Sequence, residues 1–451
     1  MRLSFLGATQ TVTGSKYLLE EDRRKILIDC GLFQGHKELR LGNWAKLPFD
    51  PVALDAVVLT HAHIDHSGYI PLLVKQGFRG KIYCSSATFD LCKILLPDSG
   101  YLQEEDARRA NKYGYTRHSP AKPLYSQKDA KAALKYFHPV EFDTSFNIGA
   151  ELRVKLRHAG HILGAACLQI DNGHQTIVFS GDLGRPNDPV MTAPEYFEGA
   201  DYLVIESTYG DRLHERTDPM KIIGEIITST MAKGGTVVIP AFAVGRTQSL
   251  LYYIHQLKSK GMIANIPVFM DSPMAINATN LLSQHQSDHR LSSEEWSQVC
   301  NRATYCKTVE ESKELDRQAL PSIIISASGM ATGGRILHHL KRYIGDSRNT
   351  ILFTGFQAGG TRGDRIVKGE KEIKIHGQMW PVRARIENLT MTSAHADYQE
   401  ILDWLGHFKN PPKKTFITHG EAEASAALKE KIAEKFGWSV VVPKYKQQEI
   451  L

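Results

Sequence analysis

The feature that most constrains this chain is a run of histidine and aspartate side chains, HAHIDH, at residues 61–66. The run follows Ala56–Thr60, a short apolar stretch typical of a buried strand. Imidazole and carboxylate groups bind zinc, and four of them within six residues on a tight turn can face two neighbouring metals. One loop cannot complete two catalytic sites, because each zinc needs three or four ligands and an open position for water. Other parts of the chain must therefore supply more ligands.

Later strand ends offer further candidate ligands. A strand-like run precedes His158 and His161 in RHAGHILGAA, Asp182 in FSGDLG and His419 in ITHGE. Neighbouring glycines suit the sharp turns that let such side chains reach a metal. Each residue alone would more often be structural, but their repetition in a chain that carries HAHIDH favours a shared metal site.

The order of strand-like and helix-like segments predicts an α/β protein with two domains. At 451 residues the chain exceeds the usual size of a single core, and its 42% hydrophobic and 23% charged residues are typical of a globular protein. Strands and helices alternate again past Gly210, in a pattern that indicates a separate parallel-sheet domain. We expect one domain to begin in residues 1–208, a second to be inserted at residues 209–375, and the first to resume at residues 376–451.

Charge and composition limit the compartment more than the function. A net charge of +6 permits an anionic ligand without requiring one, and the six cysteines show no C-x-x-C pair and no closely spaced disulfide framework. No apolar stretch reaches the roughly 20 residues of a membrane helix, and the N-terminus lacks a signal-peptide pattern. We expect a cytoplasmic protein with no membrane partner. A polar helical segment from about Leu91 to Phe137 is expected on the surface near an active-site rim.

Two glycine-containing loops are candidate phosphate-binding segments. Small residues fill SASGMATGGR between a strand ending at Ser326 and a helix beginning near Arg335, where backbone N–H groups could face a phosphate. Gly245–Thr247 in PAFAVGRTQ has the same order of strand, turn and helix. Loops of this kind can equally be tight turns, so both interpretations stay open. The candidate residues are Ser328, Gly329, Met330, Gly333, Gly334, Arg335 and Arg246.

Taken together, the motifs resemble one known family. HAHIDH, GHILGA, GDLG and the strand-end Asp29 are shared across the metallo-β-lactamase superfamily, whereas IESTYG, SAHAD and THGE are specific to its β-CASP nuclease branch. They occur in the expected order over essentially the whole chain. The resemblance implies an αββα sandwich interrupted by an inserted α/β β-CASP domain. The branch includes the nuclease subunit of the messenger-RNA cleavage and polyadenylation machinery and its prokaryotic relatives.

The resemblance also implies which residues hold the cofactors and carry out catalysis. The implied ligands are His61, His63 and His161 for one Zn²⁺, Asp65, His66 and His419 for the other, and Asp182 as the bridge between them. Asp29 would orient the ligand loop. The implied catalytic residues are His395, Glu206, Asp65 and Asp182, with His395 as a general acid that is hydrogen-bonded to Glu206. A hydroxide held between the metals would attack phosphorus, leaving a 5′ phosphate and a 3′ hydroxyl.

The expected activity is that of a zinc-dependent ribonuclease that hydrolyses single-stranded RNA, internally or from a 5′ end. The alternatives are a DNA-directed nuclease of the same branch, a small-molecule metallo-hydrolase and a non-catalytic subunit. The inserted domain favours a long polymer over a small molecule. His419 stands where DNA-repair members commonly carry valine, and the chain retains every ligand of the catalytic members. The natural RNA, pairing into a homodimer, and the use of zinc or manganese in the cell stay open.

Overall fold

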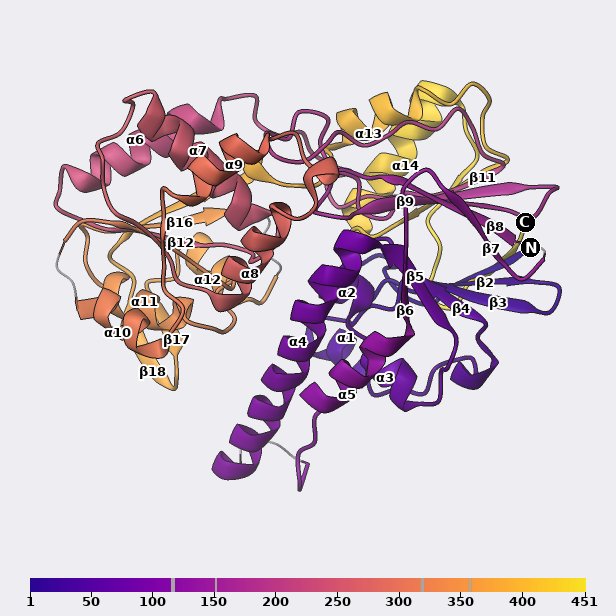
Figure 1. The fold of residues 1–451 in the computed structure, drawn as a ribbon, viewed down its shortest axis with the longest axis horizontal. Coiled ribbons are helices and arrows are strands. Elements are labelled where there is room, and N and C mark those ends of the chain that lie inside the picture. The colour runs from indigo at the N-terminus through magenta and orange to yellow at the C-terminus, as the bar shows by residue number, and fades with distance from the viewer. Residues whose placement is uncertain (115–117, 151, 318–319, 356, 358) are drawn as a thin grey trace. The chain divides into compact units, whose positions relative to one another are not determined.

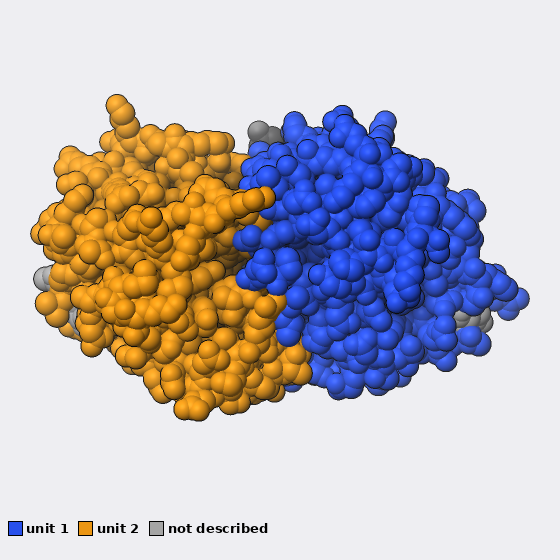
Figure 2. All heavy atoms as spheres, turned by 90° about the horizontal axis from the view of Figure 1, so that it is seen from above, with its two compact units in different colours: residues 1–187, 192–213, 395–451 blue, residues 188–191, 214–394 orange. Residues whose placement is uncertain are grey.

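The computed structural model describes residues 1–114, 118–150, 152–317, 320–355, 357 and 359–451 (Figure 1). The chain divides into two compact units, which Figure 2 distinguishes by colour. Unit 1 comprises Met1–Asn187, Thr192–Leu213 and His395–Leu451, and unit 2 comprises Asp188–Met191 and His214–Ala394. The chain therefore leaves unit 1, builds unit 2 and returns.

Unit 1 is built on two seven-stranded sheets. In spatial order, the first contains β22 (Gln448–Ile450), β1 (Arg2–Phe5), β2 (Tyr17–Glu21), β3 (Arg24–Ile28), β4 (Ala56–Val58), β5 (Lys81–Ser85) and β6 (Phe137–Val140). The second contains β21 (Val440–Val441), β20 (Lys414–Thr418), β11 (Tyr202–Glu206), β10 (Thr176–Phe179), β9 (Ala166–Asp171), β8 (Leu152–His158) and β7 (Ser145–Ile148). Each sheet is mixed, with parallel pairing from β3 to β6 and from β10 to β21.

The two sheets enclose one hydrophobic core. In β3, Ile26 and Ile28 join this core with Phe179 and Val204 of the second sheet, and all four side chains are buried. Leu27 faces the other way, because side chains alternate along a strand, and yet it too is buried. A further layer must therefore cover the outer face of the sheet.

Helices form that outer layer on both sheets (Figure 1). The helices of unit 1 are α1 (Lys37–Gly42), α2 (Ile64–Ser67), α3 (Ile70–Lys75), α4 (Ser86–Tyr113), α5 (Gln127–Ala133), α13 (Tyr398–Leu405) and α14 (Ala422–Phe436). α4 contacts β5 and β6, and α14 contacts β20 and β21. The expected αββα layering is confirmed. α4 and α5 account for most of the predicted polar helical segment, whose residues 115–117 lie outside the described part of the chain.

Unit 2 contains a six-stranded sheet in which all neighbouring strands are parallel. Its spatial order is β14 (Thr304–Tyr305), β13 (Val268–Met270), β15 (Ile323–Ser326), β12 (Val237–Pro240), β16 (Thr350–Thr354) and β19 (Arg385–Leu389). Every residue of β12, β15 and β16 is buried, as expected for a parallel sheet with both faces covered. The predicted parallel-sheet insertion is confirmed.

The helices of unit 2 are α6 (Pro219–Met231), α7 (Arg246–Ser259), α8 (Pro273–Leu282), α9 (Ser293–Cys300), α10 (Val309–Arg317), α11 (Ile336–Tyr343) and α12 (Arg362–Val367). A hairpin of β17 (Glu372–Ile375) and β18 (Gln378–Pro381) follows α12. Within the described residues of both units, no helix is both long and apolar enough to cross a membrane.

The return to unit 1 comes later than residue 376, where the sequence pattern placed it. β19 pairs in parallel with β16, from Arg385 opposite Thr350 to Leu389 opposite Thr354. This strand therefore completes the sheet of unit 2, which continues to Ala394. The amino-acid pattern could not locate this boundary, because a strand of this composition fits either sheet.

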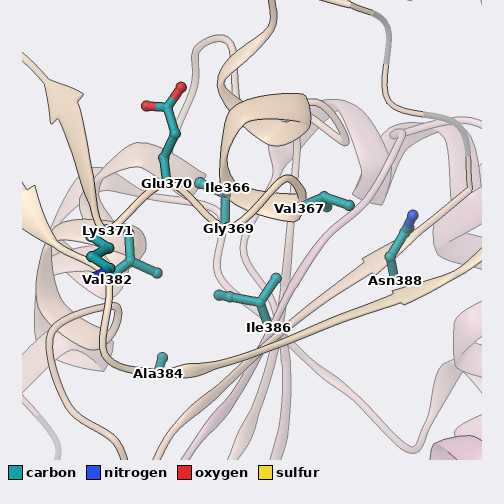
Figure 3. A pocket seen from close by; sticks show the side chains of 9 residues that line it. All are labelled: Ile366, Val367, Gly369, Glu370, Lys371, Val382, Ala384, Ile386 and Asn388. Atoms are coloured by element: carbon teal, nitrogen blue, oxygen red, sulfur yellow. The ribbon is translucent and has the colours of Figure 1, made fainter.

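Unit 2 also has a pocket of about 400 Å³ beside α12 and β19 (Figure 3). Apolar side chains such as Ile366, Val382 and Ile386 line it together with the charged Glu370 and Lys371. None of the predicted site residues lines this pocket.

A buried charge network joins α11 to the strand ends of unit 2. His339 Nε2 lies 2.7 Å from Asp271 Oδ2, and His339 Nδ1 lies 2.7 Å from Asp316 Oδ1. Burial alone would lower the pKa of His339, but hydrogen bonds to both carboxylates outweigh it and raise the pKa to about 9. At neutral pH the ring is therefore an imidazolium that donates from both nitrogens.

We predict that this network stabilises the protein in a pH-dependent way. Because the pKa of His339 rises from 6.5 to about 9 on folding, its contribution is complete below pH 6.5 and is lost as pH rises through about 9. We expect His339→Gln to lower the free energy of unfolding at both pH values. The loss should be about 3 kcal/mol larger near pH 6 than near pH 10. Urea denaturation of both proteins measures this difference, and a pH-independent value would contradict it.

Candidate metal centre

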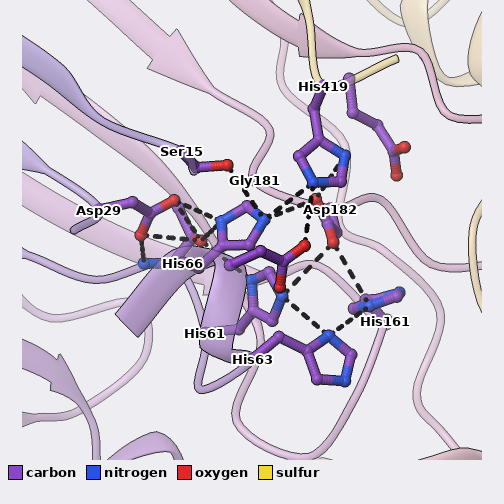
Figure 4. Close-up of polar contacts among 12 residues, drawn as sticks. Ser15, Asp29, His61, His63, His66, His161, Gly181, Asp182 and His419 are labelled. Carbon is purple, nitrogen blue, oxygen red and sulfur yellow. Dashed lines mark hydrogen bonds and ion pairs between the residues drawn. The ribbon is translucent and has the colours of Figure 1, made fainter. Parts of the chain in front are cut away.

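Loops of unit 1 that are distant in sequence converge on one site (Figure 4). The predicted ligands come from the loop after β4 (His61, His63), the short helix α2 (Asp65, His66), the β8–β9 loop (His161), and the loops after β10 (Asp182) and β20 (His419). β10, which precedes Asp182, is the middle strand of its sheet, whereas β8 and β20 each lie next to an edge strand of that sheet. His419 has a left-handed backbone with a φ of 49°, and its N–H donates to the carbonyl of Ala8 at 2.7 Å.

The first group of side chains contains three histidines and one face of a carboxylate. His63 Nδ1 lies 3.2 Å from His61 Nε2 and 3.3 Å from His161 Nε2. Asp182 Oδ2 lies 3.4 Å from His61 Nε2 and 3.5 Å from His161 Nε2. Four potential ligand atoms therefore surround one point.

The second group adjoins the other oxygen of the same carboxylate. Asp182 Oδ1 lies 3.2 Å from His66 Nε2 and 3.4 Å from His419 Nδ1. His419 Nε2 lies 3.2 Å from His66 Nε2 and 3.5 Å from Asp65 Oδ2. These side chains thus form two groups that could each hold a metal ion, with Asp182 between them.

The donor set fits divalent cations. Zinc–nitrogen bonds of about 2.0–2.1 Å place tetrahedral ligand atoms roughly 3.3 Å apart, close to the 3.2 and 3.3 Å between the histidine nitrogens. Burial lowers the pKa of His61 to about 3 and that of His63 to about 4, so both rings are neutral and can offer a lone pair. Asp182 Oδ1 is buried and accepts no hydrogen bond from the described residues.

Asp29 contacts His66 on the side of the ring that faces away from Asp182 (Figure 4). Its Oδ2 lies 2.7 Å from His66 Nδ1, and its Oδ1 accepts the Thr60 N–H at 2.8 Å. The Thr60 hydroxyl donates to Asp29 Oδ2 at 2.8 Å. With Nδ1 held in this way, His66 presents Nε2 to the site. Burial alone would lower the pKa of His66, but the charges of Asp182 and Asp29 raise it well above its usual value, a field that equally favours a metal cation.

His395 lies at the edge of the first group, with its ring centroid 4.4 Å from that of His161. His395 Nδ1 lies 3.1 and 3.2 Å from the two carboxylate oxygens of Glu206. That carboxylate is fixed in turn by the backbone N–H groups of Leu183 at 2.6 Å and Thr208 at 3.2 Å. Burial alone would lower the pKa of His395, but the charge and hydrogen bond of Glu206 raise it to about 9.

Sequence reasoning missed three residues that shape the site. The hydroxyl of Thr60 contacts Asp29, and that of Thr208 lies 3.1 Å from His419 Nδ1. Gly31 packs so closely on the ligand loop that an added Cβ would lie 1.5 Å from the Asp65 carbonyl oxygen. The sequence offered only one sign of their role: each of the three lies within two residues of a motif residue.

The two candidate phosphate loops follow adjacent strands of unit 2. SASGMATGGR joins β15 to α11, and the Arg246 loop joins β12 to α7. Because β12 and β15 are parallel neighbours, both loops lie at the carboxyl edge of the sheet. Ser328 Oγ accepts the Thr332 N–H at 3.0 Å, and Gly334 has a φ of 80° that favours glycine. The Met330 carbonyl accepts the Gly363 N–H at 2.9 Å.

Arg335 is engaged within unit 2 itself. Its Nη1 donates to Asp271 Oδ1 at 2.6 Å and to the Cys306 carbonyl at 3.0 Å, and its Nη2 donates to the Lys307 carbonyl at 3.0 Å. Arg246 is largely buried at the start of α7. Direct phosphate contacts by either arginine stay a prediction, and the geometry gives Arg335 a clear second role as an anchor of its loop.

Comparison with known proteins gives a consistent result. Residues 11–219 match the metallo-beta-lactamase superfamily, residues 247–366 the Beta-Casp domain, and residues 379–443 the Zn-dependent metallo-hydrolase RNA specificity domain. Ribonuclease TTHA0252 of Thermus thermophilus is 36% identical over 436 residues, which cover 95% of each chain. The chain belongs to the β-CASP ribonuclease branch of the metallo-β-lactamase superfamily. The expected enzyme class, a metal-dependent hydrolase, is confirmed, and membership of the superfamily implies that it binds divalent metal.

Archaeal proteins are also among the relatives of this β-CASP protein. The transcription termination factor FttA of Methanocaldococcus jannaschii is 31% identical over 468 residues, which cover 98% of this chain and 70% of that factor. A crystal structure of a protein of unknown function from Enterococcus faecalis covers 100% of this chain with a TM-score of 0.54 at 14% identity. That likeness concerns the fold alone.

We predict that Asp182→Ala lowers metal occupancy at both groups, because its two oxygens face different sets of histidines. His158→Ala is the matched control, since His158 stacks on Phe142 with ring centroids 3.7 Å apart and belongs to neither group. Metal content per chain, measured by mass spectrometry after dialysis, should fall sharply for Asp182→Ala and match the wild type for His158→Ala. Full occupancy in Asp182→Ala would rule out its bridging position.

Proposed function

We propose that this protein is a zinc-dependent ribonuclease that hydrolyses phosphodiester bonds of single-stranded RNA. The observation that carries the proposal is the His395–Glu206 pair, whose ring lies next to a histidine of the first ligand group. A site that only stored metal would have no use for a partly buried, carboxylate-bound histidine beside it. RNA as the substrate is supported by the relative named as a ribonuclease at 36% identity.

We assign His61, His63 and His161 to one Zn²⁺, Asp65, His66 and His419 to a second, and Asp182 to both. When bound, such a pair of ions activates water and neutralises charge on the phosphate. The protein's own contribution is to fix the orientation and the protonation state of these ligands. Asp29 and Thr60 fix the direction of His66, and burial keeps His61 and His63 neutral.

His395 supplies the proton that the reaction needs. Attack of water on phosphorus expels the 3′ oxygen of the preceding nucleotide, which must be protonated to leave as a hydroxyl. Glu206 holds His395 by Nδ1, so Nε2 is the nitrogen that transfers this proton. The products are then a 5′ phosphate and a 3′ hydroxyl. Glu206 itself is a positioning residue, because its oxygens are taken up by His395 and by backbone N–H groups.

RNA is held in part by the carboxyl edge of the unit 2 sheet. There, the loop that contains Ser328, Gly329, Met330, Gly333 and Gly334 offers small side chains, hydroxyls and backbone amides in a fixed conformation. An added Cβ at Gly333 would meet nothing within 4 Å, so the backbone at this position is open to a ligand. Such a surface suits a phosphodiester backbone.

The test is cleavage of end-labelled single-stranded RNA and of the matching DNA by metal-loaded protein. Wild-type protein should cleave the RNA, and His395→Ala should cleave it about 10²- to 10⁴-fold more slowly, the usual contribution of a general acid, with metal content unchanged. His407→Ala is the matched control, because His407 stacks on Tyr196 away from the ligand groups and should leave the rate unchanged.

The product pattern separates the remaining modes of action. A ladder of internal fragments indicates an endonuclease, and mononucleotides released from the 5′ end indicate an exonuclease. Faster cleavage of DNA than of RNA would make the protein a DNA-directed nuclease. No cleavage of RNA by metal-loaded wild type, or loss of metal in His395→Ala, would contradict the proposal.

A further inference from the structure

Phe242 is an exposed aromatic ring in an otherwise buried loop of unit 2. It lies between β12 and α7, where Ala241, Ala243 and Val244 are 0, 8 and 6% exposed whereas Phe242 is 36% exposed. Among the phenylalanines that the structure describes, it is the most exposed. The chain therefore turns a large apolar side chain outward at the carboxyl edge of the parallel sheet, where ligands of such sheets bind.

The ring is held in a defined place. The Phe242 carbonyl accepts the Thr247 hydroxyl at 2.8 Å and the Thr247 N–H at 3.2 Å, which fixes the backbone at the start of α7. The edge of the ring lies against Gly329, where an added Cβ would be 2.7 Å from Phe242 Cδ2 and 2.9 Å from Phe242 N. Glycine at position 329 is thus required for the ring and the neighbouring loop to meet.

The loop that contains Gly329, which the ring contacts, also carries polar groups. Ser328 and Thr332 join their hydroxyls at 3.0 Å, and the side chain of Thr332 is exposed. The Gly329 carbonyl is held by Gln357 Nε2 at 3.3 Å. The partly buried ion pair of Arg335 with Asp271 anchors the far end of the same loop. The exposed ring of Phe242 therefore lies next to a loop that carries hydroxyl and amide groups.

We propose that Phe242 is a stacking platform for a base of the RNA strand, beside the loop that receives the adjoining phosphate. This inference rests on the proposed function and adds a base contact to it. A nucleotide presents a flat apolar base next to a charged phosphate, and these two surfaces match that pairing. Stacking on an aromatic ring tolerates any base, because every base has a π-face. A single ring is also far too small for a stable protein interface.

The test compares Phe242→Leu, which keeps the apolar volume but removes the ring, with Phe242→Tyr, which keeps the ring. Leucine should raise the KM for single-stranded RNA about 5- to 150-fold, the range that one base–aromatic stack represents, with kcat little changed. Tyrosine should restore the wild-type KM. Hydrolysis of bis(p-nitrophenyl) phosphate, which has no base, should be equal in all three proteins. Met262→Ala is the matched control, because Met262 is an exposed apolar residue just beyond the other end of α7.

The substrate supplies a second control. An abasic ribose-phosphate oligomer cannot stack, so it should bind wild type and Phe242→Leu equally. An unchanged KM for RNA in Phe242→Leu, an equal loss in Phe242→Tyr, or a parallel loss with bis(p-nitrophenyl) phosphate would overturn the inference. Failure of the proposed function is distinguishable, because there the wild-type protein itself would leave RNA uncleaved.

Discussion

The candidate metal centre of unit 1 depends on one carboxylate, Asp182. Its two oxygens face two sets of histidines, at 3.4 and 3.5 Å on one side and 3.2 and 3.4 Å on the other. So many imidazoles in a buried space lose much of their hydration, and burial accordingly keeps His61 and His63 neutral. The negative charge of Asp182 offsets part of the cost of burying these imidazoles together. Divalent cations bound to the carboxylate and the imidazoles would make the arrangement favourable. The surrounding sheets serve to bring the strand-end loops to that charge.

Unit 2 also contains a buried aspartate that follows a strand, but its contacts differ. Asp271 follows β13 directly, is fully buried and is held by Arg335, His339 and Ser312 from elements that follow it in sequence. Here positive side chains of the protein itself balance the carboxylate, so no metal is needed. The result is a rigid carboxyl edge with its loops fixed in place. In both units a buried aspartate that follows a strand contacts side chains from several other loops and helices.

The convergence of the candidate ligands could be expected from the sequence, because the HAHIDH run places four potential ligands together and the other candidates each follow a strand. Their division between two metals was implied by the family resemblance. Other features depend on contacts that no local pattern encodes. The ion pair of Arg335 with Asp271 joins residues 64 positions apart, so the sequence showed Arg335 only as the last residue of a glycine-rich loop. The run AFAV reads as core, and only the tertiary structure turns Phe242 outward. The boundary at Ala394 was hidden for a similar reason, since β19 pairs with β16 across the sheet of unit 2.

The central claim is that two metal ions share Asp182. Anomalous X-ray diffraction at the zinc absorption edge, from crystals of the full-length protein grown with zinc, tests it most directly. We expect two anomalous peaks, one bonded to His61, His63 and His161 and the other to Asp65, His66 and His419, each also bonded to an oxygen of Asp182. A single peak, or two peaks of which one lacks a bond to Asp182, would contradict the account.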